Sequence, residues 1–444
     1  MRVTEPVILF SANIDCFIHV SPVFHCQHKS TRRAPCFYEI LDNNWTTAPL
    51  YTIMQGNFVK EGRTALKKIA ALFKKELMLG VALLAAVISL FITPPSARLL
   101  KDIDWKTLAT LFMLLSVLDG FKTENLFRPV IRLAGRLGSM FALTMFLVFS
   151  VFFSSMFVTN DVSLIIFVPL TMILFAAGDK RKYIVPTLCL ENIAAVRGSL
   201  LTPFGSPQNL FLFSQSGLSA LKFMGIMLPL WLMSIVLLSA FIALMYRKDI
   251  KEKIVLDGVA EQEWDPARKG QRLLYLGLFA VIVACIVTRT PYWYFVTAFV
   301  TVMLLIFDRK VFTRVDYVLL LTFLCFFVFS SSVAANPAIS EFLKKSVAGN
   351  EYLWSLGISQ IISNVPASIV LWPFTENLRA LLYGLDTAGL ITVIGSLASV
   401  INMRIYLREY PGQGGRFMLE FEKICLIFFA IVFVPQWLLI RFFA

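Results

Sequence analysis

The sequence predicts an all-α, polytopic membrane protein with two inverted-topology repeats, each holding one re-entrant hairpin and one broken transmembrane helix. Three observations lead to this prediction: an apolar composition, polar motifs inside apolar runs, and the recurrence of these motifs in the second half. Of the 444 residues, 58% are hydrophobic and 16% are charged, whereas soluble domains are about 45–50% apolar and about 25% charged. The net charge of +13 is therefore interpreted through membrane topology and not through nucleic-acid binding.

The first 60 residues differ from the rest of the chain. They hold all three histidines but no apolar run long enough for a signal peptide or a span. These histidines and the nearby cysteines match no usual zinc spacing: they are His19, His25, His28, Cys16, Cys26 and Cys36. No phosphate-binding or metalloprotease motif occurs in the chain. We expect a poorly ordered extension over 1–60 and no cofactor.

Apolar runs of about 20 residues predict membrane-spanning helices in the rest of the chain. The predicted spans are 77–93, 105–120, 183–213, 223–246, 272–288, 292–307, 317–334, 378–405 and 417–443. Two further apolar segments, 140–177 and 353–375, carry polar residues at their midpoints. If each enters and leaves by the same face, most basic residues fall on one side, which the positive-inside rule makes cytoplasmic. Both segments are therefore predicted to be re-entrant hairpins, which need a protein-lined or water-filled cavity.

The two halves share three motifs in the same order. "TNDVSLIIFVPLT" (159–171) aligns with "SNVPASIVLWPFT" (363–375), and "SLLTPFGSPQNL" (199–210) aligns with "GLITVIGSLASV" (389–400). Upstream, "IDWKTLATLF" resembles "VDYVLLLTFL". Because the hairpins open to opposite sides, this order predicts an inverted repeat, a transporter architecture with its site near the membrane midplane. The predicted parts are repeat 1 over 61–246, with hairpin tip 159–161 and broken helix 198–209, a loop and linking span over 247–291, and repeat 2 over 292–444, with hairpin tip 363–365 and broken helix 389–402.

The broken helices supply the candidate ligands. Glycine and proline interrupt helical hydrogen bonding, so freed carbonyls and nearby side chains offer hard oxygen ligands to a cation, while helix N-termini offer N–H groups to an anion. The first cluster is Thr159, Asn160, Gly198, Thr202, Gly205, Ser206 and Asn209, and the second is Ser363, Asn364, Thr392, Gly395, Ser396 and Ser399, with Asn402 as a further candidate. The competing interpretation is that single Ser, Thr and Asn residues only join helices.

Three ionisable residues lie at predicted membrane depth, where charges are costly and are functional candidates by default. Asp161 is at the first hairpin tip, and Glu191 and Arg197 are on the broken third span. Asp161 could bind a cation, carry a proton or pair with Arg197. The alternative for each is a buried structural ion pair.

These motifs together resemble the ion transporter superfamily, and within it the citrate-transporter-like and arsenite-permease-like permeases. The resemblance covers roughly Lys67 to the C-terminus. It implies sodium and carboxylate sites at the hairpin tips, a homodimer and an elevator-type motion. In the related divalent-anion/sodium symporters both tips read Ser-Asn-Thr, whereas here they read Thr159-Asn160-Asp161 and Ser363-Asn364-Val365. The acidic tip is more similar to the arsenite-permease and sodium–proton-antiporter branches.

The expected function is secondary active transport of a small anion coupled to sodium or protons, in a multi-pass protein of the bacterial inner (plasma) membrane. The nearest alternative is sodium–proton exchange at Asp161. A passive channel is disfavoured by the paired hairpins. An intramembrane enzyme would need an activated nucleophile and base, and the tips offer neither, so no enzymatic activity is expected.

Overall fold

The computed structural model describes residues 77–93, 99–134, 137–254 and 265–442, and all of these belong to the second of the chain's two units, 66–444. This described part is helical apart from loops and one isolated β-bridge between Ser139 and Lys253. Residues 1–60, for which the sequence predicts an extension, lie outside it.

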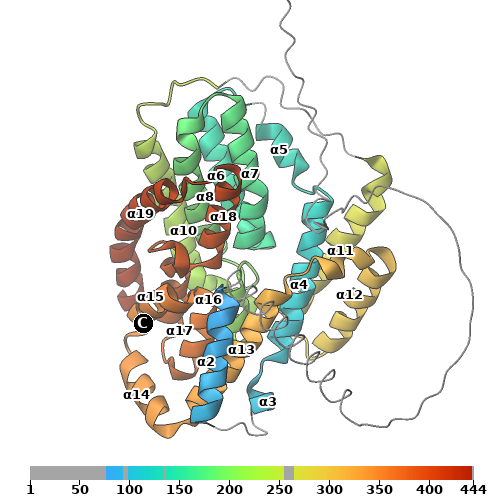
Figure 1. Ribbon diagram of the computed structural model, residues 1–444, viewed down its shortest axis with the longest axis vertical. Coiled ribbons are helices and arrows are strands. Elements are labelled where there is room, and N and C mark those ends of the chain that lie inside the picture. The colour runs from blue at the N-terminus through green and yellow to red at the C-terminus, as the bar shows by residue number, and fades with distance from the viewer. Residues whose placement is uncertain (1–76, 94–98, 135–136, 255–264, 443–444) are drawn as a thin grey trace, which may run out of the picture. The chain divides into compact units, whose positions relative to one another are not determined.

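The helices follow the predicted spans closely (Figure 1). In chain order they are α2 (Leu77–Ile92), α3 (Leu99–Asp102), α4 (Trp105–Thr123), α5 (Arg128–Ala134), α6 (Met140–Val158), α7 (Asn160–Ala177), η1 (Arg181–Tyr183), α8 (Ile184–Gly198), α9 (Pro207–Ser216), α10 (Ala220–Met245), η2 (Pro266–Arg268), α11 (Lys269–Thr288), α12 (Trp293–Phe307), η3 (Arg309–Thr313), α13 (Tyr317–Ala335), α14 (Pro337–Val347), α15 (Glu351–Ile362), α16 (Asn364–Leu371), η4 (Trp372–Phe374), α17 (Leu378–Ala388), η5 (Val393–Gly395), α18 (Leu397–Glu409) and α19 (Gly414–Phe442).

Six helices within the described ranges are long and apolar enough to cross a membrane: α6, α7, α10, the segment Pro266–Thr288, α13 and α19. Two shorter apolar helices, Leu79–Phe91 and Trp293–Phe307, add to this set. Many large apolar side chains on these helices are exposed, for example Phe91, Val236 and Ile306. An apolar exterior of this extent suits contact with lipid, so the fold is that of a polytopic membrane protein.

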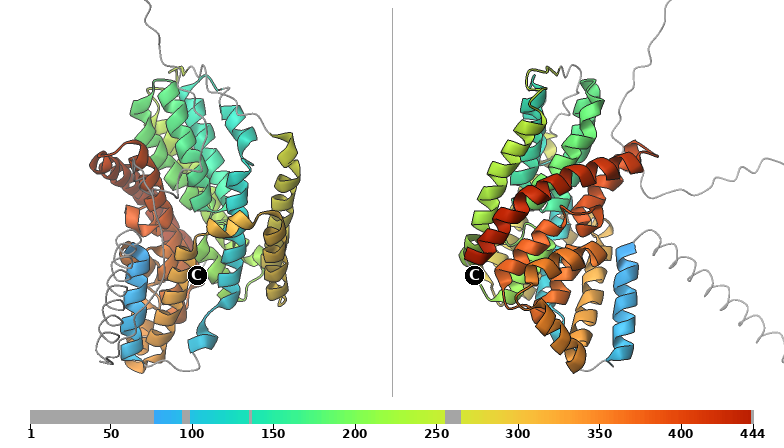
Figure 2. Two further views of the ribbon diagram at one scale, coloured as in Figure 1. Left: turned by 45° about the vertical axis from the view of Figure 1, so that its right-hand side comes forward. Right: turned by 90° about the vertical axis from the view of Figure 1, so that its left-hand side faces the viewer.

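Buried apolar side chains form two cores. One core joins α6, α7 and α8 with the second half of α10, α18 and α19. The other joins α4, α9, α11, α13, α15, α16 and α17. Figure 1 shows α6, α7 and α8 in the upper part of the picture and α15, α16 and α17 in the lower part, and Figure 2 shows the same separation from two other sides. The breaks between α8 and α9 and between α17 and α18 therefore lie where the two cores meet.

The local sequence explains where the broken helices stop and restart. Pro207 occupies the first turn of α9, where its missing N–H costs nothing. Gly217 ends α9 in the left-handed conformation, with φ 69°, which glycine adopts without steric cost. Ser219 then caps α10, because its side chain accepts a hydrogen bond from the Lys222 N–H.

Two features differ from the predicted spans. The segment after Leu371 continues as the short 3-10 turn η4, because Pro373 lies two residues beyond the end of α16 and cannot supply an N–H to prolong it. The helix α14 was not predicted, since its residues "PAISEFLKKSV" are too polar and too few for a span.

Candidate functional site

The two hairpin tips have the same backbone conformation. Thr159 separates α6 from α7 with φ 71° and ψ 156°, and Ser363 separates α15 from α16 with φ 68° and ψ 158°. Residues other than glycine rarely adopt positive φ, and holding one there costs on the order of 1–3 kcal/mol. Both sharp breaks fall at the polar residues that the sequence marks as tips.

The first tip is bonded to the first broken-helix loop. The Asn160 N–H donates to the Gly205 carbonyl at 3.2 Å, and the Thr202 hydroxyl donates to the Met156 carbonyl near the end of α6. The Asn160 side chain turns back and accepts from the Asp161 N–H at 2.9 Å. The structure thus brings Thr159, Asn160, Thr202 and Gly205 together, as the sequence predicts.

Close packing leaves no room for a side chain at the two glycines of this cluster. A Cβ on Gly198 would collide with the Phe152 carbonyl oxygen and the Ser155 hydroxyl of α6. A Cβ on Gly205 would collide with the Ser199 carbonyl oxygen within the loop itself. Gly198 therefore permits close approach of α8 to the hairpin, and Gly205 permits the tight path of the loop.

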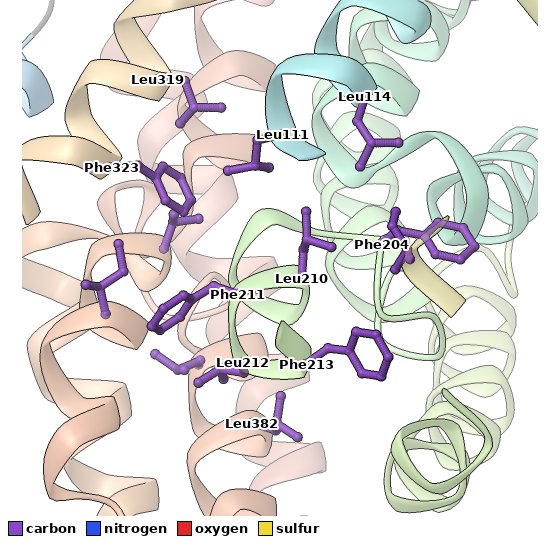
Figure 3. Close-up of a cluster of buried hydrophobic side chains, with 14 of the residues drawn as sticks. Leu111, Leu114, Phe204, Leu210, Phe211, Leu212, Phe213, Leu319, Phe323 and Leu382 are labelled. Carbon is purple, nitrogen blue, oxygen red and sulfur yellow. The ribbon is translucent and has the colours of Figure 1, made fainter. Parts of the chain in front are cut away.

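A cavity of about 180 Å³ borders the first tip. Its walls are largely apolar, with Leu111, Leu114, Phe204, Leu210 and Leu319 shown in Figure 3. The polar residues at its surface are Thr159, Asp161, Ser206, Asp119, Lys122, Arg314 and Asp316. An apolar chamber with a few convergent polar groups is the usual form of a small-ligand site.

Several helix N-termini converge on this cavity. It is lined by Asp161 in the first turn of α7, Ser206 and Pro207 at the start of α9, and Leu397 at the start of α18. Helix N-termini carry partial positive charge, which favours anions, although the Asn160 and Asp161 N–H groups of α7 are already bonded within the tip. The Ser206 hydroxyl, which is buried, has no hydrogen-bond partner among the described residues.

The charges around the cavity are only partly paired. Arg314 contacts Asp119 at 2.5 Å and Asp308 at 3.1 Å, and Asp316 caps α13 by accepting from the Leu319 N–H at 2.9 Å. One carboxylate oxygen of Asp161, by contrast, is buried and has no partner within the described part of the chain. Asp161 is therefore the cavity carboxylate that is not already engaged.

Several polar groups of the second tip and its loop form hydrogen bonds with their own surroundings. The Asn364 side chain donates to the Leu385 carbonyl at 3.3 Å, and the Ser399 hydroxyl donates to the Gly389 carbonyl at 3.3 Å. Gln360 bridges the loop, accepting from the Thr392 hydroxyl at 2.7 Å and donating to the Ala388 carbonyl at 3.2 Å.

Ser396 and Gly395 complete the second cluster. Ser396 is buried at the start of α18, and a Cβ on Gly395 would collide with the Ala388 carbonyl oxygen. Asn402, the further candidate, instead faces α8 and donates to the Leu188 carbonyl at 2.8 Å. The second cluster therefore comes together around Gln360, without Asn402.

Glu191 and Arg197 lie apart from Asp161. Glu191 is fully buried and accepts a hydrogen bond from the Thr171 hydroxyl of α7. Arg197 is also fully buried, and its guanidinium donates to Thr387 at 3.1 Å and to Gln436 at 3.3 Å. A pair between Asp161 and Arg197, one of three roles considered for Asp161, is therefore not what the structure shows.

Sequence reasoning missed three buried polar residues near Arg197. Gln208 donates to the Asp386 carboxylate at 2.8 Å, and Gln436 of α19 bonds to both Thr387 and the Tyr383 carbonyl. The signal for Asp386 was available, because it is an ionisable residue inside a predicted span. Gln208 and Gln436 are neutral and carry no such signal.

Comparison with known proteins gives concordant results. A family model described as "Citrate transporter" matches residues 68–394. The chain is 32% identical over 312 residues to "Inner membrane protein YbiR" of Escherichia coli, which covers 68% of this chain and 80% of that protein. It is 30% identical over 321 residues to "Uncharacterized transporter MJ0456" of Methanocaldococcus jannaschii, which covers 71% of this chain and 85% of that protein. The chain belongs to the citrate transporter family of membrane permeases.

Proposed function

We propose that the protein is a secondary active transporter that moves a small anion, coupled to a sodium or proton gradient, through the cavity at the first hairpin tip. The observation that carries this proposal is the convergence of the N-termini of α7, α9 and α18 on one cavity. Three such termini provide a positive field without a full positive charge, which suits an anion that must also be released. The family name makes citrate the first anion to test.

The coupling cation is assigned to the same end of the cavity. Asp161 offers an unpartnered carboxylate oxygen, and Ser206 offers a buried hydroxyl oxygen that has no partner in the described ranges. A buried polar group without a partner costs about 1–3 kcal/mol, so a bound ion or water is expected to offset this cost. A cation beside Asp161 would also cancel a negative charge that opposes an anion, which couples the two in the direction of symport.

The transport motion follows from the inverted repeat. The matching tip angles and the placement of the hairpins α6–α7 and α15–α16 in the upper and lower parts of Figure 1 support two inverted halves. Re-entrant hairpins, an elevator-type motion and a homodimer complete this proposal. The similarity to an Escherichia coli inner membrane protein supports a location in the inner membrane of a bacterium.

Sodium–proton exchange is the second candidate. It is favoured by the three carboxylates of the cavity, Asp161, Asp119 and Asp316, which exceed its two cations, Lys122 and Arg314. In that case sodium and a proton would compete for Asp161, and no anion would be needed.

Purified protein in liposomes tests both candidates. Anion symport predicts saturable citrate or other small-anion uptake that an inward sodium or proton gradient drives against the anion gradient. Robust sodium–proton exchange without an anion, abolished by Asp161→Asn, would instead establish the antiporter. Non-saturating conductance would contradict both candidates and indicate a channel.

A further inference from the structure

A further polar cluster, made by Asp386 of α17 with Gln208 and Asn209 of α9, lies outside the lining of the cavity. Asp386, Gln208 and Asn209 are each at most 2% exposed. The Gln208 amide donates to one Asp386 oxygen at 2.8 Å, and the Asn209 side chain is close enough to interact with the same carboxylate. The cluster joins the two halves, because Asp386 follows the second hairpin in sequence and the other two residues belong to α9.

Three oxygen atoms in this cluster lack partners. They are the second carboxylate oxygen of Asp386, the side-chain oxygen of Gln208 and the side-chain oxygen of Asn209, none of which accepts a hydrogen bond from any described residue. Carboxylate and amide oxygens are the ligands that hard cations prefer. An ionised carboxylate with a bare, buried oxygen is costly unless a cation or donor reaches it.

Arg197 does not fill this role. It is fully buried, but its two terminal nitrogens are directed to Thr387 and Gln436, and no ion pair with Asp386 forms within 4 Å in the described structure. Arg197 is nevertheless near enough to act on the Asp386 charge. The molecule thus holds a buried carboxylate and a buried guanidinium that influence each other without forming an ion pair.

We propose that Asp386, Gln208 and Asn209 form a buried sodium site distinct from the Asp161 end of the cavity. Sodium bound to Asp386 cancels the carboxylate charge and leaves the Arg197 charge uncompensated. In a low-dielectric interior this uncompensated positive charge attracts an anion. Sodium and anion then bind cooperatively, with a coupling of about 5- to 150-fold in affinity. This coupling role rests on the proposed anion symport, whereas the sodium site itself does not.

The site is tested by sodium binding in the absence of transported anion. The melting temperature of the purified full-length protein is measured while choline chloride is replaced by sodium chloride at constant ionic strength. A ligand that binds the native state raises this temperature in a saturable manner. We expect the wild type to show such a shift, and Asp386→Asn to need at least tenfold more sodium for half of it. Asp179→Asn, which removes a carboxylate in the turn after α7 and outside both polar sites, is expected to leave the sodium shift unchanged.

Gln208→Met provides a second variant, because it keeps the carboxylate and the side-chain length but removes one oxygen ligand. It decides the question if Asp386→Asn does not fold. The absence of any sodium shift in the wild type, or an unchanged sodium response in both Asp386→Asn and Gln208→Met, would overturn the site. An Asp386-dependent shift without anion flux in liposomes would support the sodium site and contradict only the proposed symport. Anion flux without an Asp386-dependent shift would support the symport and contradict only the sodium site.

Discussion

The two helix breaks share a backbone and differ in their surroundings. Thr159 and Ser363 have φ and ψ values within a few degrees of each other, and in both loops the glycine N–H donates to the carbonyl of the preceding threonine, from Gly205 to Thr202 and from Gly395 to Thr392. Thr159, however, is half-buried and lines the cavity, whereas Ser363 is 4% exposed and does not.

The two breaks differ in the hydrogen-bond partners of the polar groups in their loops. In the second break Gln360 accepts a hydrogen bond from the Thr392 hydroxyl and donates one to the Ala388 carbonyl. In the first break the buried hydroxyl of Ser206 has no partner in the described part of the chain, and Asp161 stands where the second break has Val365. The two breaks thus share a backbone conformation, and their side chains determine which break is open to a ligand.

The largest expected effect on transport comes from disturbing the backbone of the loop in the first break. Gly205→Ala places a methyl group against the Ser199 carbonyl, and overpacking of this kind costs about 1–3 kcal/mol. We expect loss of transport and a lower melting temperature. Gly225→Ala in α10 is the matched control, because its Cβ meets no neighbour within 4 Å, so it should transport normally. Normal flux through Gly205→Ala would show that the loop geometry is unimportant.

Removing the charge of the first break should have the next largest effect. A hydrogen bond or contact to a charged group is worth about 1.5–3 kcal/mol, so Asp161→Asn should weaken the apparent affinity for the coupling cation about tenfold or more. Uptake rates measured against sodium concentration and against pH provide the test. Asp179→Asn, in the turn after α7 and outside the cavity lining, should leave both dependences unchanged. If Asp161→Asn and the wild type show the same cation dependence, the first break is not the one that binds the coupling cation.

Removing the hydrogen bonds of Gln360 in the second break should mainly lower the stability of the fold. Gln360→Leu leaves the Thr392 hydroxyl and the Ala388 carbonyl without this partner, at a cost of about 1–3 kcal/mol. The thermal unfolding temperature should fall, while the cation dependence of the remaining transport stays at the wild-type value. A changed cation affinity in this variant would mean that the second break binds the ion as well.

The smallest effect concerns a strap that holds the start of the first hairpin. The Met140 N–H donates to the Glu252 carbonyl, and the Glu252 carboxylate accepts from Lys180 at 2.7 Å and from Tyr183. The hydrogen bond from Lys180, followed by that from Tyr183, lowers the pKa of Glu252 from 4.5 to about 2. Because the pKa of Glu252 is lower in the folded chain than in the unfolded chain, its ionised carboxylate stabilises the fold at pH values above the unfolded pKa. This stabilisation is lost as the pH falls from about 4.5 toward 2.

Glu252→Gln should therefore lower the melting temperature slightly at pH 7, and the difference from wild type should shrink in acid. Glu341→Gln removes the partner of Lys345 in an exposed pair, and it should have no measurable effect. Equal melting temperatures of Glu252→Gln and wild type at pH 7 would show that the strap adds nothing.

Much of the site could be predicted from the sequence because interruptions leave a local signature. Polar residues inside apolar runs located both tips, and Gly198, Gly205 and Pro207 located the first break. The cavity could not be predicted in the same way, because its walls come from α4, α13 and α18, which are distant in sequence. The partners of Arg197 were missed for the same reason: Thr387 and Gln436 lie 190 and 239 residues away. Asp386 was overlooked although its charge inside an apolar span marked it.

The central claim, that the first break is the one open to ligand, is tested most directly by thiol reactivity at the two tips. Thr159→Cys and Ser363→Cys are introduced separately into a protein whose native cysteines, including the buried Cys189, Cys285, Cys325 and Cys425, are replaced by alanine. The rate of reaction with a small polar thiol reagent is then measured with and without citrate and sodium. We predict faster reaction at position 159 than at position 363, and slowing at position 159 when anion and cation are present together. Equal rates at both tips, or reaction at position 159 that no anion and cation combination slows, would contradict the account.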